Sequence, residues 1–204
     1  MGRNVKQSLQ INAYLRCRLW GRGSYRVHLI IYMTMDSMNQ TEHILTDERL
    51  RQAAEEGMDS FISCFTDAYQ QRMGGEFTGE TMALLNGEQH SLLAYRILHD
   101  ELMEGGFCQL IQNGYGPYIF HNPLAKVMKL WGVTELGKLL YEARNIYEAH
   151  REDLERERTD EEFMAMYEQY EAFDDLEERF LDHEEEFTAQ VACYVDDHID
   201  RFLI

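Results

Sequence analysis

The chain has 204 residues, of which 45% are hydrophobic, and its 37 Asp/Glu against 19 Lys/Arg give a formal net charge of −18. This length and apolar content allow one domain with a real core and exclude wholesale disorder. The charge is segregated: residues 142–204 hold 22 Asp/Glu and 6 Lys/Arg, whereas residues 1–38 hold six basic residues and one acid. Because an acidic surface repels nucleic acid and attracts basic proteins, direct nucleic-acid binding is excluded and protein binding is favoured.

Residues 1–38 are predicted to be an extension outside the folded domain, which we expect to cover residues 39–204. Helical periodicity begins only after Met33, Met35 and Met38, which are plausible alternative starts, so we expect this extension to be poorly ordered or mis-annotated. The apolar stretch 28–33 is too short to span a bilayer, and 27–32 is the only strand-like stretch.

The four cysteines are far apart and form no CxxC pair. We therefore predict buried, reduced thiols, with neither a disulfide nor a thiolate metal site. This cysteine usage favours a cytoplasmic location, because disulfides are rare in a reducing compartment. No membrane association is expected.

Apolar residues recur at helical spacing along the rest of the chain, which predicts an all-α fold. We expect a compact domain of about seven to nine helices, ending in a long acidic one. Helices are predicted at 47–72, 78–86, 90–103 and 107–112, from Pro123 onward, and from Leu136 to Tyr147. Another begins at Thr159 and continues through Tyr170, and a last helical region extends to about Leu203.

Several residue types mark the ends of these helices. Gly74-Gly75 and Gly105-Gly106 are expected to stop helices, because glycine disfavours the helical interior. Asn122 is the predicted N-cap of a helix with Pro123 at its first position. Thr159 and Glu162 have the spacing of a capping box.

The last helix is predicted to be strongly two-sided. At 100° per residue its apolar side chains gather on one face: Phe173, Leu176, Phe180, Phe187, Val191 and Tyr194. Six carboxylates gather on the opposite face, and we call them the acidic stripe: Glu171, Asp174, Asp175, Glu178, Asp182 and Glu185. With a rise of 1.5 Å per residue they span about 21 Å, a mean separation of about 4.2 Å, which is of the same order as the ~3.4 Å phosphate spacing of a DNA strand.

The stripe has two interpretations. An ordinary solvated helix face is one of them. Like charges at these spacings destabilise a helix by about a few tenths of a kcal/mol each, however, which favours a binding site for a cationic partner. Glu177 and Glu184 lie at the margin of the apolar face, and we predict a structural pairing of both with Arg144, Arg151 or Arg201.

Catalytic and cofactor patterns are absent from the sequence. There is no HExxH, Glu-x-x-His or GxSxG, and the glycine pairs lack a strand–loop–helix setting. The neighbours His99-Asp100 and Asp182-His183 point about 100° apart on a helix, so we interpret both pairs as incidental. No catalytic residue, cofactor or metal site is predicted. A metal-dependent enzyme remains the least favoured alternative, and it would use His183, Asp196, Asp197 or His198.

Residues 105–116 (GGFCQLIQNGYG) resemble the GGF-x-Q-(two apolar)-x-N-x-x-G signature of the DNA-mimic protein 19 family. Residues 173–180 (FDDLEERF) are similar to its F-x-x-L-(D/E)-x-x-F stretch, and the resemblance covers about residues 88–202. It implies an all-helical bacterial protein, dimeric in a characterised member. Such a protein imitates DNA through its acidic surface and covers the DNA-binding face of a helix-turn-helix repressor.

We interpret the first signature as architectural. Its key residues are Gly105, Gly106, Phe107, Gln109, Asn113 and Gly116. The two leading glycines end one helix and let the next begin, while Phe107 enters the core. Gln109 and Asn113 are predicted to satisfy backbone groups of the following turn, where Gly116 helps the chain to reverse.

The leading hypothesis is a non-enzymatic protein that binds a DNA-binding or other basic protein through the acidic stripe, and that exists as a monomer or a homodimer. The main alternative is a structural or immunity-like interaction domain whose acidity serves solubility only.

Overall fold

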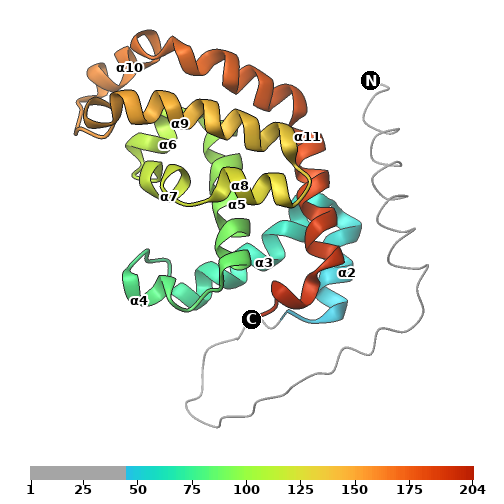
Figure 1. The fold of residues 1–204 in the computed structure, drawn as a ribbon. Helices are drawn as coiled ribbons and strands as arrows, with labels where there is room; N and C mark the ends of the chain where they lie inside the picture. Colours follow the sequence, from blue (N-terminus) through green and yellow to red (C-terminus); the bar gives the residue numbers. More distant parts are fainter. Residues whose placement is uncertain (1–44) are drawn as a thin grey trace.

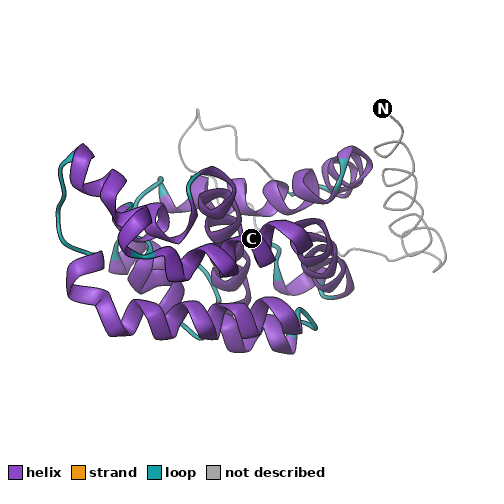
Figure 2. Ribbon diagram, turned by 90° about the horizontal axis from the view of Figure 1, so that it is seen from above, coloured by secondary structure: helices purple, strands orange, loops and turns teal. Residues whose placement is uncertain are grey.

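The computed structural model describes residues 45–204, and every regular element among them is helical (Figures 1 and 2). The all-α prediction is thereby confirmed, whereas the predictions for residues 1–38 and for the strand-like stretch lie outside the described residues. The α-helices are α2 (Asp47–Glu56), α3 (Met58–Met73), α4 (Gly79–Met82), α5 (Gly87–Glu104), α6 (Gly106–Gln112), α7 (Gly116–Phe120), α8 (Leu124–Leu130), α9 (Thr134–Leu154), α10 (Asp160–Gln169) and α11 (Asp174–Asp197). Two 3-10 helices, η1 (Glu171–Phe173) and η2 (Ile199–Arg201), flank α11.

Helix α5 lies at the centre of the molecule and packs against α3, α6, α7, α8 and α11 (Figure 1). Leu92, Leu93 and Leu98 of α5 are completely buried, so this helix forms the middle of the core. Helix α11 packs against α9, α3 and α5, which holds its apolar face inside. Within residues 45–204, no helix has both the length and the apolar character that a membrane crossing requires.

Segment 47–72 forms two helices, so the prediction of one continuous helix is wrong. The chain breaks at Gly57, whose φ of 139° and ψ of 176° are far from helical values. Only glycine adopts such a conformation readily, because it has no Cβ. The amphipathic pattern continues across the break and therefore conceals it.

The helix caps agree with the sequence except at one site. Thr159 and Glu162 form the predicted capping box, and Thr78 caps α4. At α8, however, Pro123 occupies the cap position rather than the first helical turn. No side chain caps α8, and the Asn122 amide nitrogen instead donates a 2.8 Å hydrogen bond to the carbonyl oxygen of Tyr118.

Two of the predicted buried thiols are confirmed. Cys64 and Cys108 are free and buried, while the free Cys193 is partly exposed. Burial raises the pKa of the Cys108 thiol to about 12. Its sulfur is therefore a poor nucleophile at neutral pH, because the thiolate is the reactive form.

Candidate functional site

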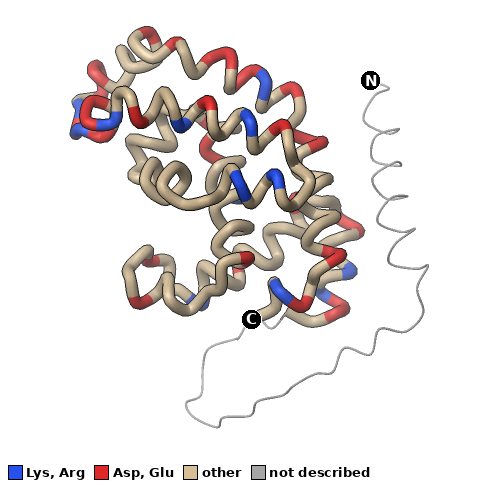
Figure 3. The backbone as a smooth tube through the Cα atoms, viewed as in Figure 1, with Lys and Arg blue, Asp and Glu red and all other residues tan. Residues whose placement is uncertain are grey.

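The acidic stripe follows one side of η1 and the first half of α11, and all six of its side chains are exposed. On the opposite side, Phe173, Leu176 and Phe180 are at most 5% exposed. The two faces of the predicted helical wheel are therefore real: the carboxylates meet solvent because the phenylalanines hold the helix against the core. Figure 3 shows acidic residues recurring along this outer helix.

Most carboxylates of the stripe form no ion pair with the described residues of the protein. Within residues 45–204, no Lys, Arg or His nitrogen lies within 4.0 Å of the carboxylates of Glu171, Asp174, Asp175, Glu178 or Asp182. The sixth member, Glu185, has interactions within the protein. Five successive carboxylates of the stripe thus face solvent without an ion-pair partner among the described residues.

One arginine interrupts the stripe but is engaged with another helix. Arg179 Nη1 lies 2.6 Å from Glu142 Oε2 on α9. Beside this pair, a shallow groove runs between α9 and the start of α11. Apolar side chains, one amide and charged side chains of both signs line it: Ile146, Ala172, Leu176, Asn145, Glu142, Asp175, Glu178 and Arg179. The stripe therefore borders a groove that also offers apolar contact.

The two signature segments meet at Glu177, which sequence reasoning assigned to an arginine. Its Oε1 accepts a 2.7 Å hydrogen bond from the backbone N–H of Phe107, at the beginning of α6. The first N–H groups of a helix have no intrahelical acceptor, so the carboxylate caps α6 from a distant helix. Burial raises the pKa of Glu177, although this hydrogen bond opposes the shift.

Gly106 makes that contact possible. Its φ is +77°, and a Cβ at this position would lie 2.3 Å from Oε1 of Glu177. The ring of Phe107 is completely buried and lies 5.1 Å from that of Phe173, centroid to centroid. The signatures therefore encode one junction between α6 and α11, which supports their architectural interpretation.

Gln109 and Asn113 have different partners from those predicted. Both amides donate to the carboxylate of Glu101 on α5, at 3.2 Å from Gln109 and 2.9 Å from Asn113 to Oε2. Gly105 leaves room for the Gln109 side chain, since a Cβ there would lie 2.1 Å from its Oε1. Gly116 instead allows a close approach of the Tyr147 ring, 2.9 Å from an added Cβ. Glu101 was missed because no local pattern links it to these residues.

Glu184 pairs with a histidine rather than with the predicted arginines. Its Oε1 lies 2.8 Å from Nε2 of His99 and accepts a 2.9 Å hydrogen bond from Thr188. The other ring nitrogen, Nδ1, lies 3.1 Å from Oδ1 of Asp100, so the neighbouring pair is not incidental. Burial alone would lower the pKa of His99, but hydrogen bonds with Asp100 and Glu184 raise it overall.

The residues weighed for a metal enzyme do not converge in the described part of the chain. His183 Nδ1 contacts the carbonyl oxygen of Arg179 at 3.0 Å, and His198 Nδ1 contacts that of Tyr194 at 2.9 Å. Neither histidine joins two other potential ligands among residues 45–204.

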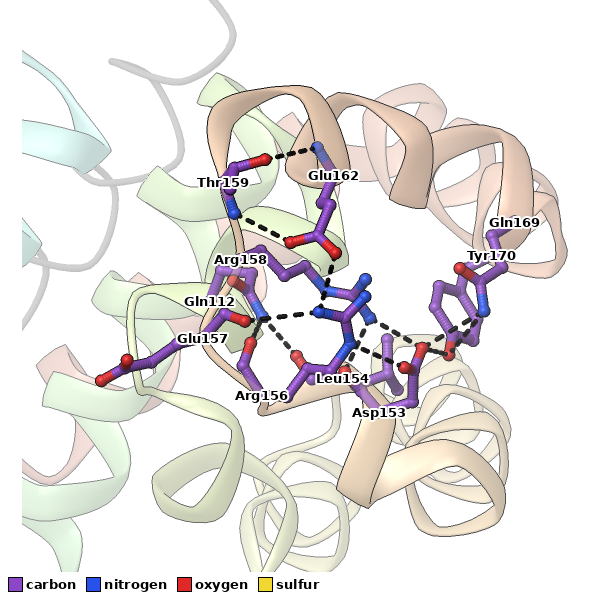
Figure 4. Close-up of polar contacts among 10 residues, drawn as sticks. All are labelled: Gln112, Asp153, Leu154, Arg156, Glu157, Arg158, Thr159, Glu162, Gln169 and Tyr170. Carbon is purple, nitrogen blue, oxygen red and sulfur yellow. Dashed lines mark hydrogen bonds and ion pairs between the residues drawn. The ribbon is translucent and has the colours of Figure 1, made fainter.

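A buried arginine, not anticipated from the sequence, organises the turn between α9 and α10 (Figure 4). The Arg158 side chain is 2% exposed, and its Nη2 donates to Oδ2 of Asp153 at 2.7 Å. Tyr170 also donates to Oδ2, and Arg156 Nε donates to Oδ1 at 3.0 Å. These three hydrogen bonds, that of Tyr170 first, hold the pKa of Asp153 well below its usual range. The network therefore links the end of α9 to the residue that follows α10.

Glu177→Gln is expected to gain free energy of unfolding relative to the wild type when the pH is raised from 4.5 to 7.5. The amide oxygen of glutamine still accepts the Phe107 hydrogen bond, but no buried charge has to form. Because the folded-state pKa of Glu177 is raised above the usual 4.5, its stabilising contribution is complete below that pH and is lost as the pH rises through the folded-state pKa. Urea unfolding of both proteins at pH 4.5 and 7.5 measures the difference.

Two further variants frame this prediction. Glu177→Ala leaves the Phe107 N–H without a partner and is expected to lose about 1–3 kcal/mol at both pH values. Glu178→Gln changes the charge of the exposed neighbour and serves as the control. A Glu177→Gln variant that becomes relatively less stable towards pH 7.5 would contradict the assignment.

Comparison with known proteins agrees with the motifs. Residues 83–198, more than half of the chain, match the family described as DMP19-like protein. A stretch of 76 residues is 42% identical to the DNA mimic protein DMP19 of Neisseria meningitidis serogroup B and covers 37% of this chain. The match spans 46% of that relative, less than half of its length. Both signatures, residues 105–116 and 173–180, lie inside the family match, and so this chain belongs to the DMP19-like protein family.

Proposed function

We propose that this protein is a non-enzymatic binding protein whose acidic stripe occupies the DNA-contacting surface of a DNA-binding protein. The observation that carries the proposal is the row of exposed carboxylates on η1 and α11, five of which lack an internal cation within residues 45–204. The name of the related DNA mimic protein DMP19 supports the same role.

The stripe has the geometry that such a role requires. Its charges follow one another at about 4.2 Å on average along the helix axis, of the same order as the ~3.4 Å between phosphates along one DNA strand. They are also fixed in place, because the buried Phe173, Leu176 and Phe180 anchor the helix that carries them. Arginine and lysine side chains that normally contact phosphates would pair with these carboxylates, so the protein would compete with DNA.

The proposal predicts binding that is sensitive to salt, to DNA and to four carboxylates. The stripe variant combines Asp174→Asn, Asp175→Asn, Glu178→Gln and Asp182→Asn. A control variant removes the same charge from exposed acids of α2, α3 and the following loop, by Glu55→Gln, Glu56→Gln, Asp67→Asn and Glu76→Gln. Wild type and both variants are immobilised, and proteins retained from a native lysate are eluted with duplex DNA.

The expected result is a DNA-eluted protein that wild type and control retain and that the stripe variant does not. For that purified partner, the affinity for the stripe variant should be at least about tenfold lower, equivalent to about 1.4 kcal/mol. Raising the salt concentration from 50 to 300 mM should also lower the affinity of the wild type at least about tenfold, because salt screens exposed charge pairs. A partner that binds the stripe variant normally, or is indifferent to salt, would instead favour the scaffold alternative.

The homodimer implied by the family resemblance stays a prediction. Light scattering of the eluting protein after size exclusion distinguishes the two states. A molar mass near 24.1 kDa at micromolar concentration would contradict the dimer.

A further inference from the structure

Three helices bring a histidine and two carboxylates together away from the stripe. Asp59 lies in the first turn of α3, His99 near the end of α5 and Glu184 in the middle of α11. One ligand atom of each lies within 4.8 Å of the others. The side chains of His99 and Glu184 are 11% and 15% exposed, whereas that of Asp59 is 62% exposed and open to solvent.

The distances are close to those of a tetrahedral metal site. His99 Nε2 lies 2.8 Å from Glu184 Oε1 and 3.9 Å from Asp59 Oδ1. Two ligands at about 2.0–2.1 Å from a tetrahedral Zn²⁺ are roughly 3.3 Å apart. The first pair would therefore have to open, and the second to close, by about half an ångström. The exposed Asp59 side chain can make the second of these movements.

The surroundings orient the ligands as metal sites commonly do. Asp100 Oδ1 lies 3.1 Å from Nδ1 of His99, which directs the other nitrogen, Nε2, towards the cluster. A carboxylate on the second ring nitrogen is the usual arrangement for a metal-binding histidine. Thr188 donates to Glu184 at 2.9 Å, and Tyr95 bonds to Thr188 at 2.7 Å. Hydrogen bonds thus orient both less exposed ligands: Asp100 holds His99, and Thr188 holds Glu184.

One cation competes for this cluster. Arg96 Nη1 lies 3.5 Å from Asp59 Oδ1, and its Nε donates to Asp100 at 2.9 Å. The shorter contact is with Asp100, so the arginine can keep its main partner while Asp59 turns towards a metal ion.

We propose that Asp59, His99 and Glu184 bind one divalent transition-metal ion, which ties α3, α5 and α11 together and keeps an open position for water. One nitrogen and two oxygen ligands suit Zn²⁺, which commonly binds three protein ligands and a water molecule. This site is independent of the stripe, and its loss would leave the proposed binding function testable.

The test uses full-length protein stripped with a chelator and then titrated with Zn²⁺, with a competing chelator as indicator. Asp59→Asn removes a ligand charge from an exposed position and should leave the fold intact. Asp67→Asn, on the same helix and also exposed, is the matched control. We expect one Zn²⁺ per chain for wild type and control, and an affinity at least tenfold lower for Asp59→Asn. Substitution with Co²⁺ should give the visible absorption of a tetrahedral ion in wild type and in Asp67→Asn, but not in Asp59→Asn.

Several results would overturn the proposal. One is the absence of stoichiometric Zn²⁺ binding, which would leave protonated His99 as the cation between the two carboxylates. Another is a Zn²⁺ affinity that Asp59→Asn and Asp67→Asn lower equally, because the ion would then bind elsewhere. If Asp59→Asn unfolds, Glu184→Gln supplies the same comparison, with Glu185→Gln as its control.

Discussion

Gly106→Ala is expected to lower the free energy of unfolding by about 2–5 kcal/mol. The positive φ of +77° costs an L-residue about 1–2 kcal/mol. The new Cβ would also lie 2.3 Å from the Glu177 carboxylate and displace it. The Phe107 N–H then loses its acceptor, which costs about another 1–3 kcal/mol. Chemical denaturation followed by circular dichroism measures the loss.

A second glycine separates the two contributions. Gly75 has nearly the same φ, +76°, but an added Cβ would have no neighbour within 4 Å. Gly75→Ala should therefore show only the backbone part, about 1–2 kcal/mol. In a Glu177→Ala background the effect of Gly106→Ala should shrink towards that value. Equal effects of the two glycine substitutions would refute a role for the Glu177 contact.

Asp153→Ala is expected to destabilise the protein by about 3 kcal/mol. It leaves the guanidinium of Arg158, whose side chain is 2% exposed, without its anionic partner. An uncompensated buried charge is among the most destabilising single changes. Glu152→Ala removes the exposed neighbouring acid and should change stability by less than about 0.5 kcal/mol.

The pH dependence provides an independent check of Asp153. Its folded-state pKa lies below the ordinary 3.8, with hydrogen bonds from Tyr170, Arg158 and Arg156 as the cause. The carboxylate therefore stabilises the fold above pH 3.8 and loses this effect only as the pH falls towards its folded-state pKa. The difference between wild type and Asp153→Ala should be the same at pH 5 and pH 8. A loss below 1 kcal/mol would mean that Arg158 turns out to solvent in the variant.

The site was predictable in part. The two faces of α11 follow from residue spacing alone, and all six carboxylates of the stripe are exposed as predicted. The spacing also indicated that Glu177 and Glu184 lie at the edge of the apolar face, but it suggested arginine partners for both. Their actual contacts, the Phe107 N–H and His99, lie 70 and 85 residues away in the chain. No periodicity carries information about contacts at that separation.

The sequence by itself determined most of the helices, several of their ends and the segregation of charge, because these depend on neighbours within one or two turns. It missed the short α7, and it extended the helix from Thr78 to residue 86 although α4 ends at Met82. The sequence did not reveal the break at Gly57, because the amphipathic pattern continues through it. Only the tertiary structure decided which polar groups meet: Glu177 with the start of α6, Glu101 with Gln109 and Asn113, and Asp59 with His99 and Glu184. The contacts of Glu177 and of the Asp59 cluster come from packing of helices distant in sequence, and those of Glu101 from the fold of α6 back onto α5. Neither arrangement follows from helical periodicity, whereas buried polar groups need partners wherever the packing places them.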